Sequence, residues 1–146
     1  MDIEMNQLSK AIILATKAHA GQLDKAGEQY ILHPLRLMIK AKNEIDRCVA
    51  VLHDVVEDTC INIHDLRREG FSEEIIEAVL CLTKQKGESY KEFIIRLSKN
   101  KVARRVKILD LKDNLDLSRL KDITDKDIKR ADKYKKALAL LEEVTD

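Results

Sequence analysis

Residues that interrupt helices are scarce in this sequence. One proline and four glycines occur among 146 residues, and tryptophan is absent. Glycine and proline are the residues least compatible with a helix interior, and stretches of alternating β-branched residues are also few. The sequence therefore predicts an all-α fold. Its length suits a single domain over residues 1–146, a bundle of about seven or eight helices.

An excess of one charge sign and long apolar runs are lacking too. Charged residues make up 36% of the chain, but the formal net charge is only +1. No global basic field therefore indicates nucleic acid or an anionic membrane as a partner. No apolar run could span a bilayer and residues 1–4 do not begin a signal peptide, so we expect a cytoplasmic protein. Cys48, Cys60 and Cys81 form no Cys-x-x-Cys pair and are predicted to be reduced packing residues.

Apolar residues at helical spacing predict where the helices lie. Asn62, Ser72 and Ser89 are expected N-caps, and Gly21 is expected to stop the first helix. Pro34 suits a first helical turn and should hold His33 before it in an extended cap conformation. The predicted helices cover residues 4–19, 34–42, 45–57, 62–70, 72–82, 89–97, 101–117 and 126–143.

One stretch, residues 49–59, places four ionisable side chains beside a run of Val, Ala and Leu. His53 and Glu57 are four apart, as are Asp54 and Asp58, so each pair shares a face of a helix. Unpaired charge in such apolar surroundings is costly. A divalent metal ion explains the cluster best, because imidazole and carboxylate can hold the ion while leaving positions open for a reactive water.

Four residues are candidate metal ligands: His33, His53, Asp54 and Asp110. A lone buried histidine is more often a hydrogen-bonded core residue than a ligand. The pair His64-Asp65 provides an internal comparison, because it lies in a polar stretch and is expected to be solvated.

The acidic residues that follow Asp110 are harder to interpret. Asp113 and Asn114 share its helical face, but we expect Asp113 and Asp116 to belong to a solvated stripe. Asn114 could orient a ligand or contact a substrate. His19 is expected to form a hydrogen bond in the core or behind the ligands.

Several of these residues belong to motifs that recur in order in one family. The motifs are Ala18-His19-Ala20-Gly21-Gln22, Gly27, Tyr30-Ile31-Leu32-His33-Pro34, Leu52-His53-Asp54-Val55-Val56-Glu57-Asp58-Thr59 and Lys107-Ile108-Leu109-Asp110. The series resembles the HD phosphohydrolase superfamily, and within it the hydrolase domain of RelA/SpoT-type enzymes, which degrade guanosine tetra- and pentaphosphate. The long enzymes of this family continue into synthetase and sensory domains, whereas this chain ends at Asp146, so we expect a small stand-alone hydrolase without synthetase activity.

The resemblance implies roles for particular residues. It makes His33, His53, Asp54 and Asp110 the metal ligands, with manganese as the usual ion. It makes Glu57 and Asp58 the carboxylates that position and deprotonate the attacking water. It also implies that Asn114 and Lys25 contact the nucleotide. Asp24 stands where the family has an arginine before this lysine, and the reversed charge favours a different nucleotide or phosphate ester as an alternative substrate.

Basic side chains near the motifs could offset phosphate charge. The candidates are Lys25, Arg36, Lys107 and Arg119. Each could equally be an ordinary solvated charge, and the basic run over residues 99–107 is expected to be mainly a solvated helix face.

Three hypotheses remain at this stage. The first is a manganese-dependent hydrolase that releases pyrophosphate from the 3′ position of guanosine tetra- or pentaphosphate. The second is a related enzyme acting on another nucleotide or phosphate ester. The third is a catalytically silent module that binds a nucleotide or a protein.

Overall fold

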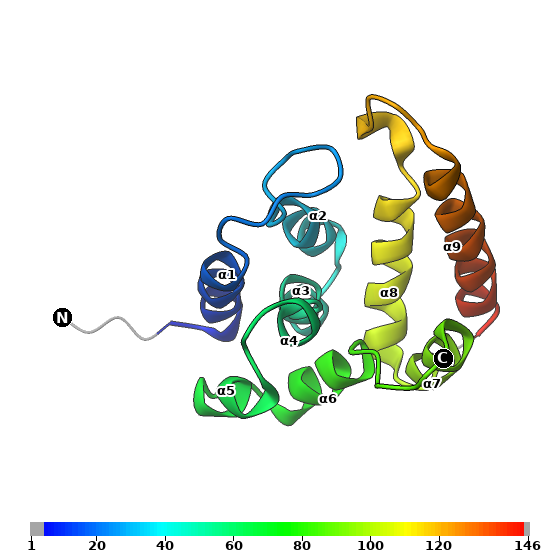
Figure 1. Cartoon of the computed structure of the whole chain (residues 1–146). Coiled ribbons are helices and arrows are strands. Elements are labelled where there is room, and N and C mark those ends of the chain that lie inside the picture. The colour runs from blue at the N-terminus through cyan, green and yellow to red at the C-terminus, as the bar shows by residue number, and fades with distance from the viewer. Residues whose placement is uncertain (1–4, 145–146) are drawn as a thin grey trace.

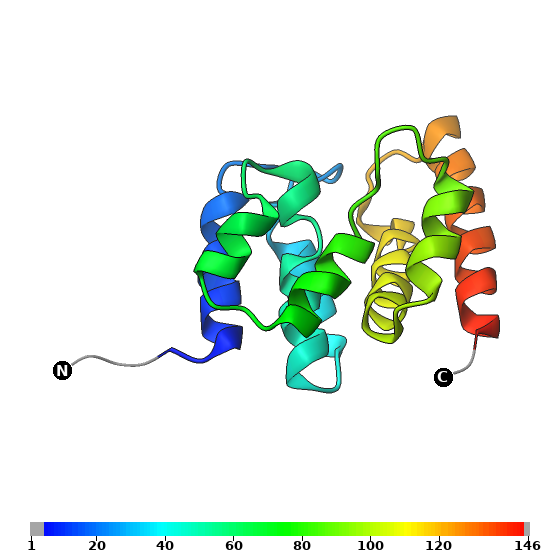
Figure 2. The ribbon, with the colours of Figure 1, turned by 90° about the horizontal axis from the view of Figure 1, so that it is seen from below.

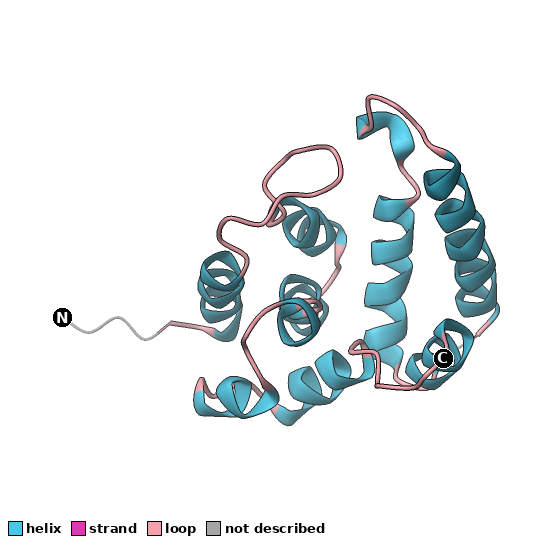
Figure 3. Ribbon diagram, viewed as in Figure 1, coloured by secondary structure: helices cyan, strands magenta, loops and turns pink. Residues whose placement is uncertain are grey.

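The computed structural model describes residues 5–144, and its regular structure within that range is helical (Figures 1 and 3). The helices are α1 (Gln7–Ala18), α2 (Leu32–Lys40), α3 (Glu44–Leu52), α4 (Val55–Asp58), α5 (Ile63–Arg68), α6 (Glu73–Cys81), α7 (Tyr90–Ser98), α8 (Lys101–Asn114), the 3-10 helix η1 (Leu117–Arg119) and α9 (Asp125–Glu143). The predicted all-α class is confirmed. Over residues 5–144, no helix combines the length and the apolar character needed to cross a membrane.

Helix α3 lies at the centre of the fold, in contact with α1, α2, α6 and α8 (Figure 1). Its residues 48–52 are fully buried. Burial of a Val or Leu side chain stabilises a fold by about 1.5–3 kcal/mol, so this short helix contributes strongly to the core. Helix α8 packs on α3 and also against α7 and α9, which Figure 2 shows side by side with it. The end of α3 is therefore held in the interior, between α2 and α8.

The three predicted N-caps and the predicted stop of the first helix are confirmed. The side chains of Asn62, Ser72 and Ser89 each accept the backbone N–H three residues on, as expected of N-caps. Gly21 adopts a φ of 85°, which a residue with a Cβ rarely adopts. The first helix begins at Gln7, whereas the start predicted at residue 4 lies outside the described residues.

The helix predicted over residues 45–57 is instead two helices, α3 and α4, joined by a turn at His53 and Asp54. Asp54 has φ −105° and ψ −1°, a sparsely populated region in which active-site residues are often found. Its carboxylate contacts the Tyr30 hydroxyl and the His53 ring. The helical spacing of the neighbouring residues does not predict the contact with Tyr30, which lies 24 positions away. Two short helices, α3 and α4, thus stand where one helix was predicted.

Two other boundaries differ from the predictions. His33 is not an extended cap but lies inside α2, where contacts on both ring nitrogens outweigh the preference imposed by Pro34. The helix predicted to reach residue 117 ends at Asn114, because the Asp116 carboxylate caps the following 3-10 turn through the backbone N–H of Ser118.

The predicted solvation of the basic run over residues 99–107 is wrong for two members. Arg104 is buried and donates to the Ser98 carbonyl at 2.8 Å, and only 14% of the Lys107 side chain is exposed. The cysteines are all free, as predicted, but Cys60 is exposed and does not pack in the core.

Candidate active site

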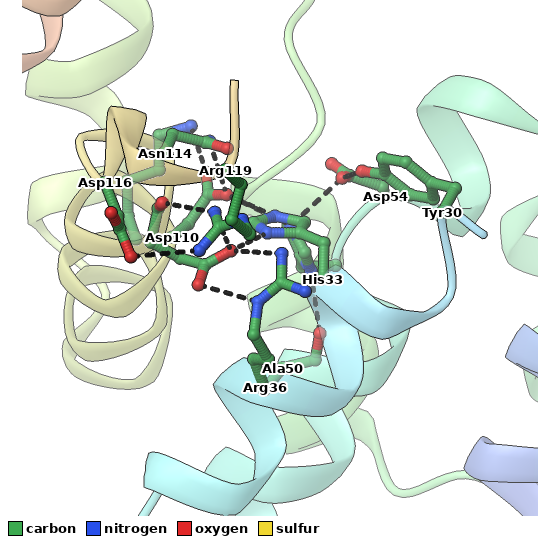
Figure 4. A network of polar contacts seen from close by, with 12 residues as sticks. Tyr30, His33, Arg36, Ala50, Asp54, Asp110, Asn114, Asp116 and Arg119 are labelled. Atoms are coloured by element: carbon green, nitrogen blue, oxygen red, sulfur yellow. Dashed lines mark hydrogen bonds and ion pairs between the residues drawn. The ribbon is translucent and has the colours of Figure 1, made fainter. Parts of the chain in front are cut away.

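The four predicted metal ligands converge from three parts of the chain. His33 comes from α2, His53 and Asp54 come from the α3–α4 turn, and Asp110 comes from α8. The rings of His33 and His53 lie 5.3 Å apart. One oxygen, Asp110 Oδ1, is 2.8 Å from His33 Nε2 and 3.5 Å from His53 Nε2 (Figure 4). Ligand atoms of His33, His53 and Asp54 all lie within 4.8 Å of one another, which is close enough to share one ion.

The surroundings of His53 fit a bound cation. Its Nδ1 is 2.7 Å from the Ala50 carbonyl, which can only accept, so Nδ1 carries a proton. Its Nε2 is buried and makes no hydrogen bond of good geometry with any described residue. Asp54 Oδ2 lies 3.0 Å from this nitrogen. A lone pair facing carboxylates is unfavourable unless a proton or a cation lies between them, and imidazole with carboxylate suits a divalent transition ion.

Neighbouring groups favour the ionised form of Asp110. Burial alone would raise its pKa, but Lys107 and the two histidine rings hold that pKa well below the ordinary value. Lys107 Nζ is 2.8 Å from Asp110 Oδ2, and this carboxylate raises the pKa of Lys107 despite the lysine's burial. Lys107 was a candidate for binding phosphate, but it is paired with a candidate ligand instead. It is not among the residues that line a cavity beside His33.

The two carboxylates of α4 lie beside this cluster. Ligand atoms of Asp54, Glu57 and Asp58 are within 4.8 Å of one another. Glu57 Oε1 accepts the backbone N–H of Lys84 at 2.9 Å, which ties the loop after α6 to the site. Burial, followed by the charges of Asp54 and Glu57, raises the pKa of Asp58 to about 6. Asp58 can thus take up a proton at a higher pH than an ordinary aspartate.

Tyr30 and Asp113, neither of them predicted to belong to the site, contact the candidate ligands. The Tyr30 hydroxyl donates to Asp54 Oδ2 (Figure 4). Asp113 was expected in a solvated stripe, but it is buried, 3% exposed, and bonds to His33. Its position three residues after Asp110 on one helical face was the signal that could have identified it. Asp116, by contrast, is exposed as predicted.

His19 forms the expected hydrogen bond in the core. Its Nδ1 is 2.9 Å from Gln22 Oε1, and the Gln22 amide donates to the Asp58 carbonyl at 3.1 Å. His19 thus supports the end of α4 through Gln22. Among the described residues, it belongs to neither group of potential metal ligands.

A cavity of about 360 Å³ opens next to the ligand cluster. Its walls come from the loop after α1, from α2, from the region around η1 and from α9. Four predicted substrate-binding residues line it: Lys25, Arg36, Asn114 and Arg119. Four further lining residues that were not predicted come from α9, all more than ten positions past the last motif: Asp127, Arg130, Ala131 and Tyr134. The pKa of Lys25 is lowered, first by burial and then by the charge of Arg130.

Three of the polar residues in the cavity wall are already paired with protein groups. The Arg36 and Arg119 guanidinium groups donate to Asp113, and Asn114 Nδ2 donates to Asp110 Oδ1 at 3.1 Å. Lys25 is the predicted substrate residue with no such partner among residues 5–144.

Asp24 also lines the cavity, but its carboxylate serves the loop itself. Asp24 Oδ1 accepts the backbone N–H groups of Ala26 and Glu28, each at 2.9 Å. The negative charge is therefore partly offset by two N–H dipoles. Asp24 closes the loop that presents Lys25.

The fold with its His/Asp cluster resembles an HD-type hydrolase domain. A solved structure described as a metazoan ortholog of SpoT that hydrolyses ppGpp superposes on 100% of the chain and 90% of its own, with a TM-score of 0.80 and 22% sequence identity. At this identity the superposition establishes the fold alone. No family model matches the chain.

Sequence comparison points to the same group. The chain is 31% identical over 122 residues to a guanosine-3′,5′-bis(diphosphate) 3′-pyrophosphohydrolase of Aquifex aeolicus, and 37% identical over 95 residues to the bifunctional (p)ppGpp synthase/hydrolase SpoT of Escherichia coli K12. These matches cover 75% and 61% of this chain but only 17% and 14% of the two relatives. A GTP pyrophosphokinase of Streptomyces coelicolor is 32% identical over 94% of the chain and 17% of its own length. The chain is thus RelA/SpoT hydrolase-like, as its motifs indicated, and spans less than a fifth of these relatives.

Proposed function

We propose that the chain is a metal-dependent phosphohydrolase that removes the 3′-diphosphate of guanosine tetra- or pentaphosphate. The products are pyrophosphate and GDP or GTP. The observation that carries the proposal is the convergence of His33, His53, Asp54 and Asp110 beside Glu57 and Asp58, at the edge of a cavity with cationic side chains. Relatives named as 3′-pyrophosphohydrolases support the choice of substrate.

Each group of residues has a distinct task in this proposal. His33, His53, Asp54 and Asp110 hold a divalent ion, Mn²⁺ in our proposal, which supplies Lewis acidity and an activated water when bound. Asp58 would accept a proton from the attacking water, and Glu57 would orient that water. The water oxygen forms a bond to the 3′-phosphorus, the bond to the 3′-oxygen breaks, and the 3′-oxygen takes up a proton. Lys25, whose ammonium group has no hydrogen-bond or ion-pair partner among residues 5–144, offsets phosphate charge beside the cavity.

A second candidate substrate, another nucleotide or phosphate ester, is favoured by Asp24 at the cavity wall. An acid near a polyphosphate is unfavourable. The two hydrogen bonds that Asp24 accepts from its own loop reduce this repulsion, so guanosine tetraphosphate remains the first choice.

The direct test is turnover of guanosine tetraphosphate by the purified chain, with Mn²⁺ and with a chelator. We expect Mn²⁺-dependent release of pyrophosphate and GDP, followed by nucleotide chromatography. Activity confined to other members of a nucleotide and phosphate-ester panel would keep the metal mechanism and replace the substrate. Metal binding without turnover on any member would favour the silent binding module.

The loop after α6 provides a separate prediction. Arg96 donates to Glu88 Oε2 at 2.7 Å and to the Thr83 carbonyl at 2.9 Å, and the pKa of Glu88 falls to about 2, mainly through this pair. These Arg96 contacts fix the loop that places the Lys84 N–H against Glu57 Oε1. Arg96→Gln is therefore expected to lower kcat by roughly 10- to 100-fold, because a displaced catalytic group is costly.

Metal affinity should not change in Arg96→Gln, because Arg96 contacts none of the candidate ligands. The matched control is Arg67→Gln, which breaks the exposed Arg67–Glu73 pair on α5 and α6 and should leave kcat unchanged. Equal kcat values for both variants and wild type would show that the Arg96 contacts do not position Glu57.

A further inference from the structure

Asp113 makes an unusual number of contacts for a side chain outside the ligand cluster. Its Oδ2 is 2.6 Å from His33 Nδ1. Arg36 donates from Nε to Oδ1 and from Nη2 to Oδ2, both at 2.9 Å. Arg119 Nη2 lies 3.5 Å from Oδ2 and donates to the Asp113 backbone carbonyl at 2.9 Å. Figure 4 shows both guanidinium groups turned toward the same place beside His33.

The contact with His33 determines which ring nitrogen is available to a metal. An ionised carboxylate can only accept, so the 2.6 Å contact requires a proton on Nδ1. The other nitrogen, Nε2, lies 2.8 Å from Asp110 Oδ1, so the same rule places a proton there when no cation is bound, and this is the proton that a metal ion would replace. A ring oriented in this way offers its Nε2 lone pair to an ion without having to rotate.

The two arginines explain how the carboxylate can stay ionised where it is. The Asp113 side chain is only 2% exposed, and burying an isolated carboxylate would cost several kcal/mol. A two-bond Arg36 pair and a second cation, Arg119, compensate this charge. Both arginine heads are thus held against the wall of the cavity by Asp113.

We propose that Asp113 is a positioning residue that fixes the Nδ1–H form and the orientation of His33, with Arg36 and Arg119 holding the carboxylate in place. The inference rests on the proposed metal site, since it assigns Nε2 of His33 to the ion. In this inference Arg36 and Arg119 support His33 indirectly, because they hold the Asp113 carboxylate that contacts its ring.

The test measures metal affinity by competition with a chromophoric chelator, using Zn²⁺ and Mn²⁺ separately. Asp113→Leu removes the acceptor while keeping the branched shape and the number of heavy atoms, and it should weaken binding about 10- to 100-fold, the usual cost of losing such a partner. The matched control is Asp46→Asn, because Asp46 is also buried and doubly bonded to an arginine, Arg105, but belongs to the far end of α3. This control should bind metal as wild type does.

A second measurement needs no variant. In Zn²⁺-loaded wild-type protein with ¹⁵N-labelled histidine, His33 should show a protonated Nδ1 and a metal-bound Nε2. A metal-bound Nδ1 and a protonated Nε2 would overturn the inference, and this result does not depend on whether Asp113→Leu folds. If Asp113→Leu folds and binds metal as tightly as wild type, the inference is also overturned. Failure of wild-type protein to bind either ion would instead remove the proposed metal site.

Discussion

Replacing His53 with alanine is expected to abolish divalent-metal binding and metal-dependent hydrolysis together. The ring contributes a buried Nε2 that faces Asp54 and Asp110. Loss of an orienting partner alone costs about 10- to 100-fold in affinity, so loss of a ligand should exceed that range. Metal content after gel filtration and turnover of guanosine tetraphosphate measure the two effects.

Thermal unfolding gives an independent measure of the same change. A ligand at 100 times its Kd stabilises the native state by about 2.7 kcal/mol, so wild-type Tm should rise on addition of metal and His53→Ala should show no rise. The matched control is His64→Ala, which alters the other His-Asp pair, on α5, where the His64 side chain is exposed. It should retain both the rise and the turnover. Turnover by metal-free His53→Ala would contradict the whole assignment of the site.

The parts of the fold that follow from local chemistry could be predicted. Asn62, Ser72 and Ser89 act through hydrogen bonds three residues away, so the sequence around each cap contains the whole signal. His53 and Asp54 were recognisable because charge beside a long apolar run requires compensation. The turn that separates α3 from α4 was not predictable in this way, because its contact with Tyr30 spans 24 positions.

Asp113 and Asp116 show most clearly where sequence analysis fails. They occupy one acidic stretch, yet the first is buried and the second exposed. The difference arises from His33 and Arg36, which lie 80 and 77 positions from Asp113. Helical spacing places residues on a face, but it does not show what packs against that face. Arg104 was misassigned for the same reason, since the surrounding helices bury it.

Asp58→Asn is expected to lower kcat by about 10²- to 10⁴-fold while metal stays bound, because the variant loses its proton acceptor. The Asp58 carboxylate forms no side-chain hydrogen bond within the described part of the chain, and burial and neighbouring charge raise its pKa to about 6. A carboxylate with a raised pKa is protonated, and therefore inactive as a base, up to a higher pH. Wild-type kcat/KM should thus fall as the pH drops through a value at or below about 6, since a bound cation lowers this pKa further.

Glu57→Gln separates orientation from proton transfer. The glutamine Oε1 can still accept the Lys84 N–H that Glu57 accepts now, so the variant should bind metal and lose less activity than Asp58→Asn. Glu73→Gln, an exposed carboxylate paired with Arg67, serves as the matched control and should leave kcat unchanged. The acidic limb of the pH profile should persist in Glu57→Gln and disappear in Asp58→Asn. The opposite result would make Glu57 the proton acceptor, and a limb retained in both variants would place the base elsewhere in the cavity.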